Sequence, residues 1–240
     1  MNILITICAR GGSKGIPGKN LKPIAGKALI FYTLDVAKRI SENYTCKIAL
    51  STDDFAIKKT VENFGVVTNY IRPDFLATDF AGKIETIKDL LLYEESLINH
   101  KYDFVLDLDV TSPLRTLEDL EKSFNLIRSN PDALNLFSVN SSARNPYFNM
   151  VEENDKGFYS LVKMNSCGSI KTRQSAPKVY DMNASFYWYR RPFFDLGINT
   201  SISNKSIIYE MNHICFDLDR PIDFIFMEFL LQNNLLDFKL

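Results

Sequence analysis

The chain of 240 residues is predicted to form an α/β fold, with a Rossmann-like, mostly parallel sheet covered by helices on both faces. Two observations support this prediction. Short apolar, β-branched segments alternate with segments of helical hydrophobic spacing, which is the order of a parallel sheet with crossover helices. A glycine-rich loop follows the first apolar segment directly. Ligands in such folds bind at the carboxyl ends of the strands, so this loop marks the expected site.

The elements of the first half follow from local signals. Ile3–Ala9 is short, apolar and β-branched, which predicts a strand. Acidic residues open the segment Asp53–Phe64 and a glycine closes it, which predicts a helix. Thr116–Asp119 resembles a capping box before another helix. The further predicted helices are Leu29–Ile40, Ile84–Ile98 and Thr116–Arg128, and the further strands are Lys47–Ser51, Val66–Tyr70, Phe104–Leu108 and Asn135–Val139.

The alternation stops between residues 141 and 182, where turn signals separate short β-like pieces. These signals are Asn145-Pro146, Asn154–Gly157 and Cys167–Ser169. Alternation returns with predicted strands at Ala184–Tyr189 and His213–Phe216, before a terminal helix that begins at Pro221. We expect residues 1–140 and 183–240 to form the core, and 141–182 to be an inserted α+β subdomain that contacts another subunit.

Composition argues against several classes of function. The net charge is −1 and there is no basic block, so nucleic acid is not an expected partner. No apolar run reaches the roughly 18 residues of a membrane helix, so a membrane is not expected either. The 4 cysteines form no CxxC pair, so we expect reduced thiols and a cytoplasmic protein. The 2 histidines lack metal-binding spacing, which leaves carboxylates, lysines, arginines or a bound metal to carry the chemistry.

The loop from Ala9 to Asn20 combines glycines with three cations. Glycines let backbone N–H groups approach an anion closely, and Arg10, Lys14 and Lys19 can neutralise phosphate oxygens. Each such charge-assisted hydrogen bond contributes roughly 1.5–3 kcal/mol. The loop matches neither a Walker A motif nor the dinucleotide-binding GxGxxG motif. We interpret it as a polyphosphate cradle, and the alternative is a flexible surface loop with scattered lysines.

Asp217 and Asp219 are a candidate metal pair near the end of the sequence. Residues two apart in a strand face the same side and would lie about 6.6 Å apart, so both carboxylates could reach one Mg²⁺ or Mn²⁺ ion or a close pair. Magnesium prefers one or two carboxylates together with waters and substrate phosphates. The alternative is that Asp219 merely caps the helix that begins at Pro221.

Asp107, Asp109 and Thr111 fit a different pattern. Their spacing matches the aspartyl nucleophile motif of haloacid-dehalogenase-type phosphatases, in which the first aspartate is phosphorylated. The motif follows a middle strand of this chain, however, and it leaves the loop Arg10–Lys19 unexplained. We expect these carboxylates to line a strand end, and we keep the phosphatase as an alternative.

The glycine-rich loop also resembles a known family. Ala9–Gly15 with Lys19-Asn20 is similar to the signature of the acylneuraminate cytidylyltransferases, the CMP-sialic acid synthetases. The family's further motifs occur in the expected order and span nearly the whole chain: Ser51–Asp53, Arg72-Pro73 with Leu76-Ala77, Thr111–Arg115, Arg173-Gln174, Asn183-Ala184 and Phe216–Asp219. Each motif is modest alone, and together in this order they are specific.

The resemblance implies a nucleotidyltransferase-type fold and a role for each matching residue. The triphosphate of CTP would contact Arg10, Ser13, Lys14 and Lys19, and the cytidine would contact Asn20, Arg72 and Lys83. The sugar acid would contact Asp109, Thr111, Arg173, Gln174, Asn183 and Tyr187. Mg²⁺ would bind Asp217 and Asp219, while catalysis would depend on Arg10, Lys19 and Asp219 and Asp53 would support the site. The middle segment would form a dimer arm that helps to build the partner's sugar pocket.

Two positions differ from the commonest sialate enzymes. Asp109 stands where those enzymes have a glutamine that touches the sugar, and Lys83 stands where they have a serine near the base. An ionised carboxylate only accepts hydrogen bonds, and it repels an anionic sugar unless a donor lies between them. Together with Asn145–Phe148 and Asp181–Ser185, this pattern resembles enzymes for bacterial nonulosonates such as legionaminic acid.

These observations predict a homodimeric cytidylyltransferase that couples CTP to a nine-carbon α-keto sugar acid and releases pyrophosphate. The anomeric hydroxyl would attack the α-phosphorus in line, so positioning and charge neutralisation would dominate catalysis. No residue stands out as a general base. The alternatives are a transferase for pseudaminate or an eight-carbon ulosonate, and a nucleotide-binding module without catalytic activity.

Overall fold

The computed structural model describes residues 1–12, 15–164, 170 and 172–240. Within this part of the chain the main strands are β1 (Ile3–Cys8), β4 (Cys46–Ser51), β5 (Phe104–Leu108), β6 (Asn135–Ser141), β9 (Tyr180–Arg190) and β10 (Ser206–Glu210). They form a six-stranded sheet in the order β10-β6-β9-β5-β1-β4. Neighbouring strands are parallel except that β9 lies antiparallel to both β5 and β6. The predicted α/β fold with a mostly parallel sheet is confirmed.

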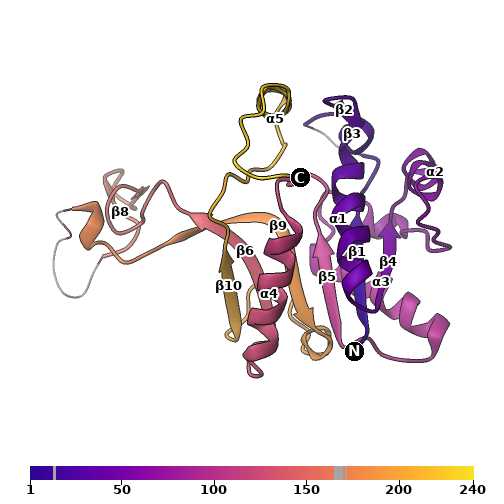
Figure 1. Cartoon of the computed structure of the whole chain (residues 1–240). Helices are drawn as coiled ribbons and strands as arrows, with labels where there is room; N and C mark the ends of the chain where they lie inside the picture. The colour runs from indigo at the N-terminus through magenta and orange to yellow at the C-terminus, as the bar shows by residue number, and fades with distance from the viewer. Residues whose placement is uncertain (13–14, 165–169, 171) are drawn as a thin grey trace.

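Helices cover both faces of this sheet (Figure 1). The described α-helices are α1 (Leu29–Asn43), α2 (Phe55–Asn63), α3 (Lys83–Ile98), α4 (Leu117–Ser129) and α5 (Pro221–Gln232). Successive residues of β1 point to opposite faces: Ile5 joins the core with α1 and α4, whereas Leu4 joins the core with α3. None of these described helices has both the length and the apolar character that spanning a bilayer requires.

Capping residues set the start of several helices. Asp54 accepts hydrogen bonds from the backbone N–H groups of Ala56 and Ile57 at 2.7 and 3.0 Å, so α2 begins directly after it. Thr116 forms the predicted capping box with Asp119 at the start of α4. At α5 the N-cap position belongs to Arg220. The alternative in which Asp219 caps this helix is therefore wrong.

The loops that follow the parallel strands gather at one edge of the sheet. In Figure 1 the N-terminus lies at the lower edge, and β1 runs from there towards the upper edge. The upper edge also carries α5 and the small hairpin of β2 (Pro23–Ile24) and β3 (Lys27–Ala28). Residues from the two ends of the sequence thus lie together where the sequence predicts the site.

The chain between the end of β6 at Ser141 and the start of β9 at Tyr180 leaves this core as an arm, while residues 180–182 still pair with β6 in the sheet. Within it, β7 (Val151–Glu153) and β8 (Tyr159–Leu161) form an antiparallel pair that projects away from the sheet (Figure 1). The expected helical part of an α+β subdomain is absent from the described residues of the arm, which hold only a 3₁₀ turn at Arg173–Ser175. The turn signal at Cys167–Ser169 lies outside the described residues.

Two predicted strands are wrong. The residues of Val66–Tyr70 are alternately buried and exposed, but the segment pairs with no described strand. His213–Phe216 is likewise outside the sheet. The neighbouring segment Ser206–Glu210 instead forms β10, which pairs with β6 in parallel.

Candidate active site

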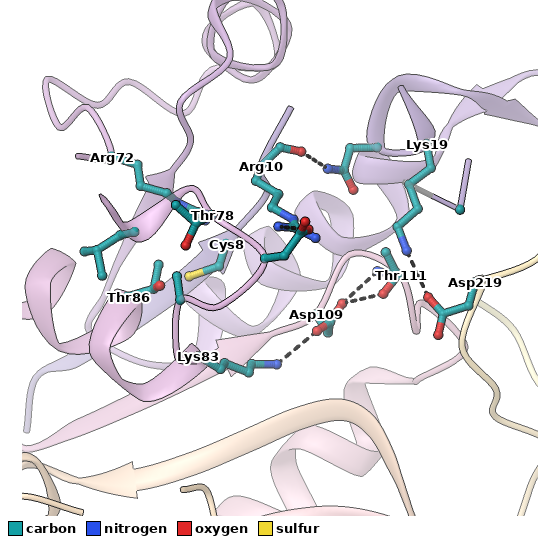
Figure 2. Close-up of a pocket in the computed structure, with 15 residues that line it drawn as sticks. Cys8, Arg10, Lys19, Arg72, Thr78, Lys83, Thr86, Asp109, Thr111 and Asp219 are labelled. Carbon is teal, nitrogen blue, oxygen red and sulfur yellow. Dashed lines mark hydrogen bonds and ion pairs between the residues drawn. The ribbon is translucent and has the colours of Figure 1, made fainter. Parts of the chain in front are cut away.

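A cavity of about 530 Å³ opens at the carboxyl edge of the parallel strands (Figure 2). Its walls come from the loop after β1, the segment Arg72–Thr86, the turn after β5 and the segment before α5. The structure brings eight of the predicted site residues to it: Arg10, Lys19, Asn20, Arg72, Lys83, Asp109, Thr111 and Asp219. Segments far apart in the sequence therefore share one cleft, as predicted.

The glycine-rich loop and the segment before α5 meet closely. Lys19 Nζ lies 3.1 Å from Asp219 Oδ1 and 3.4 Å from the carbonyl oxygen of Leu218. A Cβ atom at Gly15 would lie 2.6 Å from the carbonyl oxygen of Asp219, which is closer than real Cβ contacts allow. Only glycine fits at this approach, so the glycine at this position has a packing reason, in addition to the phosphate binding that the sequence predicts for the loop.

Two of the side chains that line the cavity are themselves buried. Asn20 is 5% exposed and its amide donates to the carbonyl oxygen of Arg10 at 2.9 Å. Arg72 is 5% exposed and donates to the hydroxyl and the carbonyl of Ser51 at 2.9 and 2.8 Å. Buried polar groups bonded in this way stay fixed in orientation. Both positions are therefore pre-arranged before any ligand binds.

Arg10 faces a carboxylate that the sequence analysis missed. Its guanidinium lies 2.8 Å from Asp79 Oδ1, on the opposite wall of the cavity. No motif pointed to Asp79, because it lies in an irregular segment before α3. Thr86 was also missed, although its spacing of three residues from Lys83 on the same helix places both on one face.

Lys83 and Asp109 form the floor of the cavity, and Asp107 lies beneath them. Lys83 Nζ lies 2.9 Å from Asp109 Oδ2, 3.0 Å from Asp107 Oδ2 and 4.4 Å from the centre of the Tyr187 ring. Burial alone would lower the pKa of Lys83, but the two carboxylates raise it well above its usual value. Lys83 therefore stays charged, and its positive charge is shared between two acids.

Asp109 is ionised for the same reason. Burial opposes ionisation, but Lys83 and two hydrogen bonds from Thr111 lower the pKa of Asp109 to about 2. These bonds come from the backbone N–H and the hydroxyl of Thr111, both at 2.9 Å. The buried guanidinium of Arg115 and the hydroxyl of Thr33 donate to the Asp109 carbonyl at 2.7 and 3.2 Å and fix the turn.

Asp217 has the opposite environment. Its Oδ1 is buried and has no hydrogen-bond partner in the described part of the chain. Burial first, then the charges of Asp109 and Asp219, raise the pKa of Asp217 to about 7. The segment is not a strand as predicted, and Leu218 is fully buried and donates its N–H to the carbonyl oxygen of Thr111. Asp219 lines the cavity, whereas Asp217 is half-buried and lines a neighbouring hollow instead. An uncompensated carboxylate here suits a cation.

Several predicted residues lie away from the cavity. Arg173 donates to the carbonyl of Ser142, and Gln174 is exposed beside it in the arm. Asn183 is buried and bonds to Asn140, Ser138 and Ser185, so its polar atoms are already used within the protein. Tyr187 is 5% exposed and lies beneath Lys83 without lining the cavity. Ser13 and Lys14 lie outside the described residues.

The geometry contradicts the phosphatase alternative. Asp107 is 1% exposed, accepts a hydrogen bond from the Thr6 hydroxyl at 2.8 Å and faces Lys83. A phosphate ester has no path to its oxygens, so Asp107 is not an exposed nucleophile. The Cys8 thiol does line the cavity, but it is not suited to act as a nucleophile, because burial and then the charge of Asp107 raise its pKa to about 12.

Comparison with known proteins identifies the family. The sequence model of the family described as "Cytidylyltransferase" matches residues 4–238, almost the whole chain. The chain belongs to the cytidylyltransferase family. The aspartyl-phosphatase alternative is thereby excluded, and the resemblance seen in the glycine-rich loop is confirmed.

Within this family, the chain can be compared with individual relatives. It is 37% identical to "Post-translational flagellin modification protein B" of Campylobacter coli, over 99% of this chain and 98% of the relative. It is 36% identical to the CMP-N,N'-diacetyllegionaminic acid synthase of Campylobacter jejuni, over 96% and 95%. A synthase of the same name from Legionella pneumophila is 30% identical over 98% of both chains.

Solved structures confirm the fold. A CMP:2-keto-3-deoxy-manno-octonic acid synthetase complexed with CTP matches with a TM-score of 0.67 and 17% identity, over 98% of this chain and 100% of the other. A 4-diphosphocytidyl-2C-methyl-D-erythritol synthase from Anaerococcus prevotii matches with a TM-score of 0.66 and 14% identity, over 96% of both chains. The nucleotidyltransferase type of fold is therefore shared across these proteins.

Proposed function

We propose that this cytidylyltransferase couples CTP to a nonulosonate of the legionaminic type, giving the CMP-sugar and pyrophosphate. The observation that carries the proposal is the shared cleft, in which Lys19 of the glycine-rich loop contacts Asp219 at the far end of the sequence. The relatives named as legionaminic acid synthases, at 36% and 30% identity, support the choice of sugar. Asp109 and Lys83, the two departures from the commonest sialate pattern, support it independently because they form one ion pair.

The residues of the cleft divide between the parts of the substrates. Asn20 and Arg72 would orient the cytidine, since both are buried and already fixed. Arg10 and Lys19 would neutralise the triphosphate and stabilise the departing pyrophosphate. The sugar hydroxyl would attack the α-phosphorus in line, which asks the protein for positioning and charge stabilisation rather than covalent chemistry.

Asp217 and Asp219 would hold a divalent cation. The buried Oδ1 of Asp217 without a hydrogen bond and the raised pKa of this carboxyl fit such an ion. The described residues offer no cluster of three or more acidic, histidine or cysteine ligands, so waters and phosphate oxygens would complete the coordination. When bound, Mg²⁺ or Mn²⁺ would neutralise phosphate charge and make the attacking hydroxyl more acidic.

The arm would join two subunits. It exposes large apolar side chains, with Phe158 70%, Tyr159 67% and Met164 83% exposed. Burying such side chains against a second copy is favourable, at about 25 cal/mol per Å² of apolar area. We propose a homodimer in which Arg173 and Gln174, which lie away from the cavity of their own chain, contact the sugar acid in the partner's cavity. A cytoplasmic location stays a prediction.

Pyrophosphate release tests the function. The purified protein with CTP and Mg²⁺ should release pyrophosphate with N,N'-diacetyllegionaminic acid, more slowly with N-acetylneuraminate, and least with an eight-carbon ulosonate. Lys19→Ala should lower kcat by at least about 100-fold, because it removes a cation that acts on developing charge. Lys22→Ala is the matched control, since Lys22 is exposed and lies outside the cavity. Full activity of Lys19→Ala, or binding of CTP without turnover on any sugar acid, would contradict the proposal.

A further inference from the structure

Asp107 lies beneath the floor of the cavity without lining it. The Thr6 hydroxyl donates to its Oδ1 at 2.8 Å. Its Oδ2 makes no hydrogen bond within the described part of the chain, and Lys83 Nζ lies 3.0 Å away. A buried carboxylate is costly unless a cation compensates it. Asp107 therefore holds the Lys83 ammonium in place from the side that faces the protein interior.

The polar groups of the floor leave little hydrogen-bonding capacity for a ligand. The Lys83 ammonium has three N–H donors, and two of them face Asp107 and Asp109. Thr111 donates twice to Asp109 Oδ1, while Oδ2 accepts from Lys83. One donor on Lys83 and one acceptor site on Asp109 Oδ2 therefore remain, on atoms 2.9 Å apart.

Charge decides which part of a sugar acid this pair can accept. Lys83 carries one positive charge, whereas Asp107 and Asp109 carry two negative charges, so the floor is net negative. A carboxylate would be repelled here. The N–H and C=O of a trans amide point in opposite directions and cannot both reach adjacent atoms. A hydroxyl both donates and accepts through a single oxygen, so it can bond to Lys83 and Asp109 together.

We propose that Asp107 is a positioning residue for sugar selection: it fixes Lys83 against Asp109, and the resulting donor–acceptor pair binds one hydroxyl of the sugar acid. This inference rests on the proposed function and adds to it. It places Lys83 on the sugar side of the cavity, beside Asp109, rather than on the nucleotide side that the family resemblance implied. The sugar carboxylate would then lie away from the floor.

The test compares the parent sugar acid with analogues that each lack one hydroxyl. With the wild-type protein, one of these deoxy analogues should lose about tenfold or more in kcat/KM, the size of a hydrogen bond to a charged group. In Asp107→Asn this discrimination should fall to within about twofold, and KM for the parent sugar should rise about tenfold while KM for CTP changes little. Thr6→Val, which removes the hydroxyl that holds Asp107, should show an intermediate loss of discrimination.

A matched control separates positioning from general destabilisation. Glu95 is another buried carboxylate on α3, bonded to Arg191 at 2.7 Å, and it lies about 18 Å along the helix from Lys83. Glu95→Gln should lower the melting temperature and leave the discrimination between sugars unchanged. Wild-type discrimination in Asp107→Asn, or an equal rise in KM for CTP, would overturn this inference alone. A wild-type protein without turnover on any sugar acid would instead overturn the proposed function.

Discussion

Asp109 lies on the floor of the cavity, whereas Asp217 belongs to the segment before α5, which forms one wall of the cavity through Asp219 but not through Asp217 itself. Both are partly buried carboxylates, yet their pKa values move in opposite directions. Lys83 and Thr111 compensate Asp109 and lower its pKa to about 2. Asp217 has no such partners, so burial and two neighbouring acids raise its pKa to about 7. The floor is complete without a ligand, whereas the proposed cation would stabilise the wall that contains Asp219 and its neighbour Asp217. The chain thus compensates one of these carboxylates with its own residues and leaves the other without a partner among the described residues.

The strongest test of this comparison replaces each carboxylate by its amide. Asp217→Asn should lower kcat by about 100-fold or more, because it removes a ligand of the proposed cation. Without metal it should nevertheless raise the free energy of unfolding near pH 7, on the order of 1–3 kcal/mol, because ionising the buried acid is no longer needed. Asp109→Asn should lower that free energy by a similar amount. If both substitutions changed the free energy of unfolding in the same direction, the contrast between the two carboxylates would be wrong.

The pH dependence of these effects follows from the same shifts. The folded pKa of Asp217 exceeds its ordinary value of 3.8, so its ionisation lowers stability as the pH rises from about 4 to about 7. The folded pKa of Asp109 is below that value, so its contribution is present above about pH 4 and is lost as the pH falls towards 2. Chemical denaturation of both variants and the wild type between pH 3 and 8 measures these slopes.

A smaller effect on catalysis is expected where the glycine-rich loop contacts the wall formed by the segment before α5. Gly15→Ala would place a Cβ atom 2.6 Å from the Asp219 carbonyl oxygen and push the wall away from Lys19. We expect KM for CTP to rise about tenfold, comparable to the loss of one charge-assisted hydrogen bond. Gly12→Ala is the matched control, because a Cβ atom there would meet nothing within 4 Å. Equal kinetics for the two variants would show that the wall does not depend on this approach.

The smallest predicted effect concerns how the wall is anchored. His213 Nε2 lies 2.9 Å from Asp119 Oδ2, which ties the segment before the wall to the start of α4. Burial lowers the pKa of His213, but Asp119 outweighs it and raises that pKa above its ordinary 6.5. The pair therefore stabilises the fold below about pH 6.5, and this contribution is lost as the pH rises through the folded pKa.

Thermal melting tests that anchor. His213→Gln should reduce the free energy of unfolding by about 1 kcal/mol at pH 6 and by clearly less at pH 9. Lowering the pH far enough to protonate Asp119, whose pKa is lowered below its ordinary value, should also remove the difference. A deficit of equal size at pH 6 and pH 9 would show that His213 acts by packing against Phe238 instead.

Much of the fold and about half of the site follow from local sequence signals. Capping residues such as Asp54 and Thr116 act within a few residues, so they predict helix starts well. The glycine and cation spacing of the first loop likewise predicts a phosphate cleft. These signals can be recognised in the sequence because the residues involved interact with neighbours only a few positions away.

The failures concern partners that are distant in the sequence. Val66–Tyr70 has the alternating burial of a strand, but strand formation also needs a neighbour to pair with, which the pattern alone does not show. Asp79 was missed as a site residue because its partner, Arg10, comes from another element. Asp107 was named only as a possible nucleophile or as a strand-end carboxylate, because its pairing with Lys83 of α3 cannot be seen in the sequence. Asn183 fits a family motif, but only the structure shows that its side chain bonds within the core.

Strand β9 runs for 11 residues, from the base of the arm to Arg190. Its only described residue in the left-handed region is Ala184, at a φ of 55°, where the pairing with β6 also shifts register. Beyond this point the same strand carries Ser185, which bonds to Arg115, and Tyr187, whose ring supports Lys83. The arm and the residues that support Lys83 are thus connected by one continuous strand. The left-handed conformation of Ala184 within it costs about 1 kcal/mol. A partner that held the arm would therefore act on the same strand that carries Tyr187 beneath the proposed sugar site.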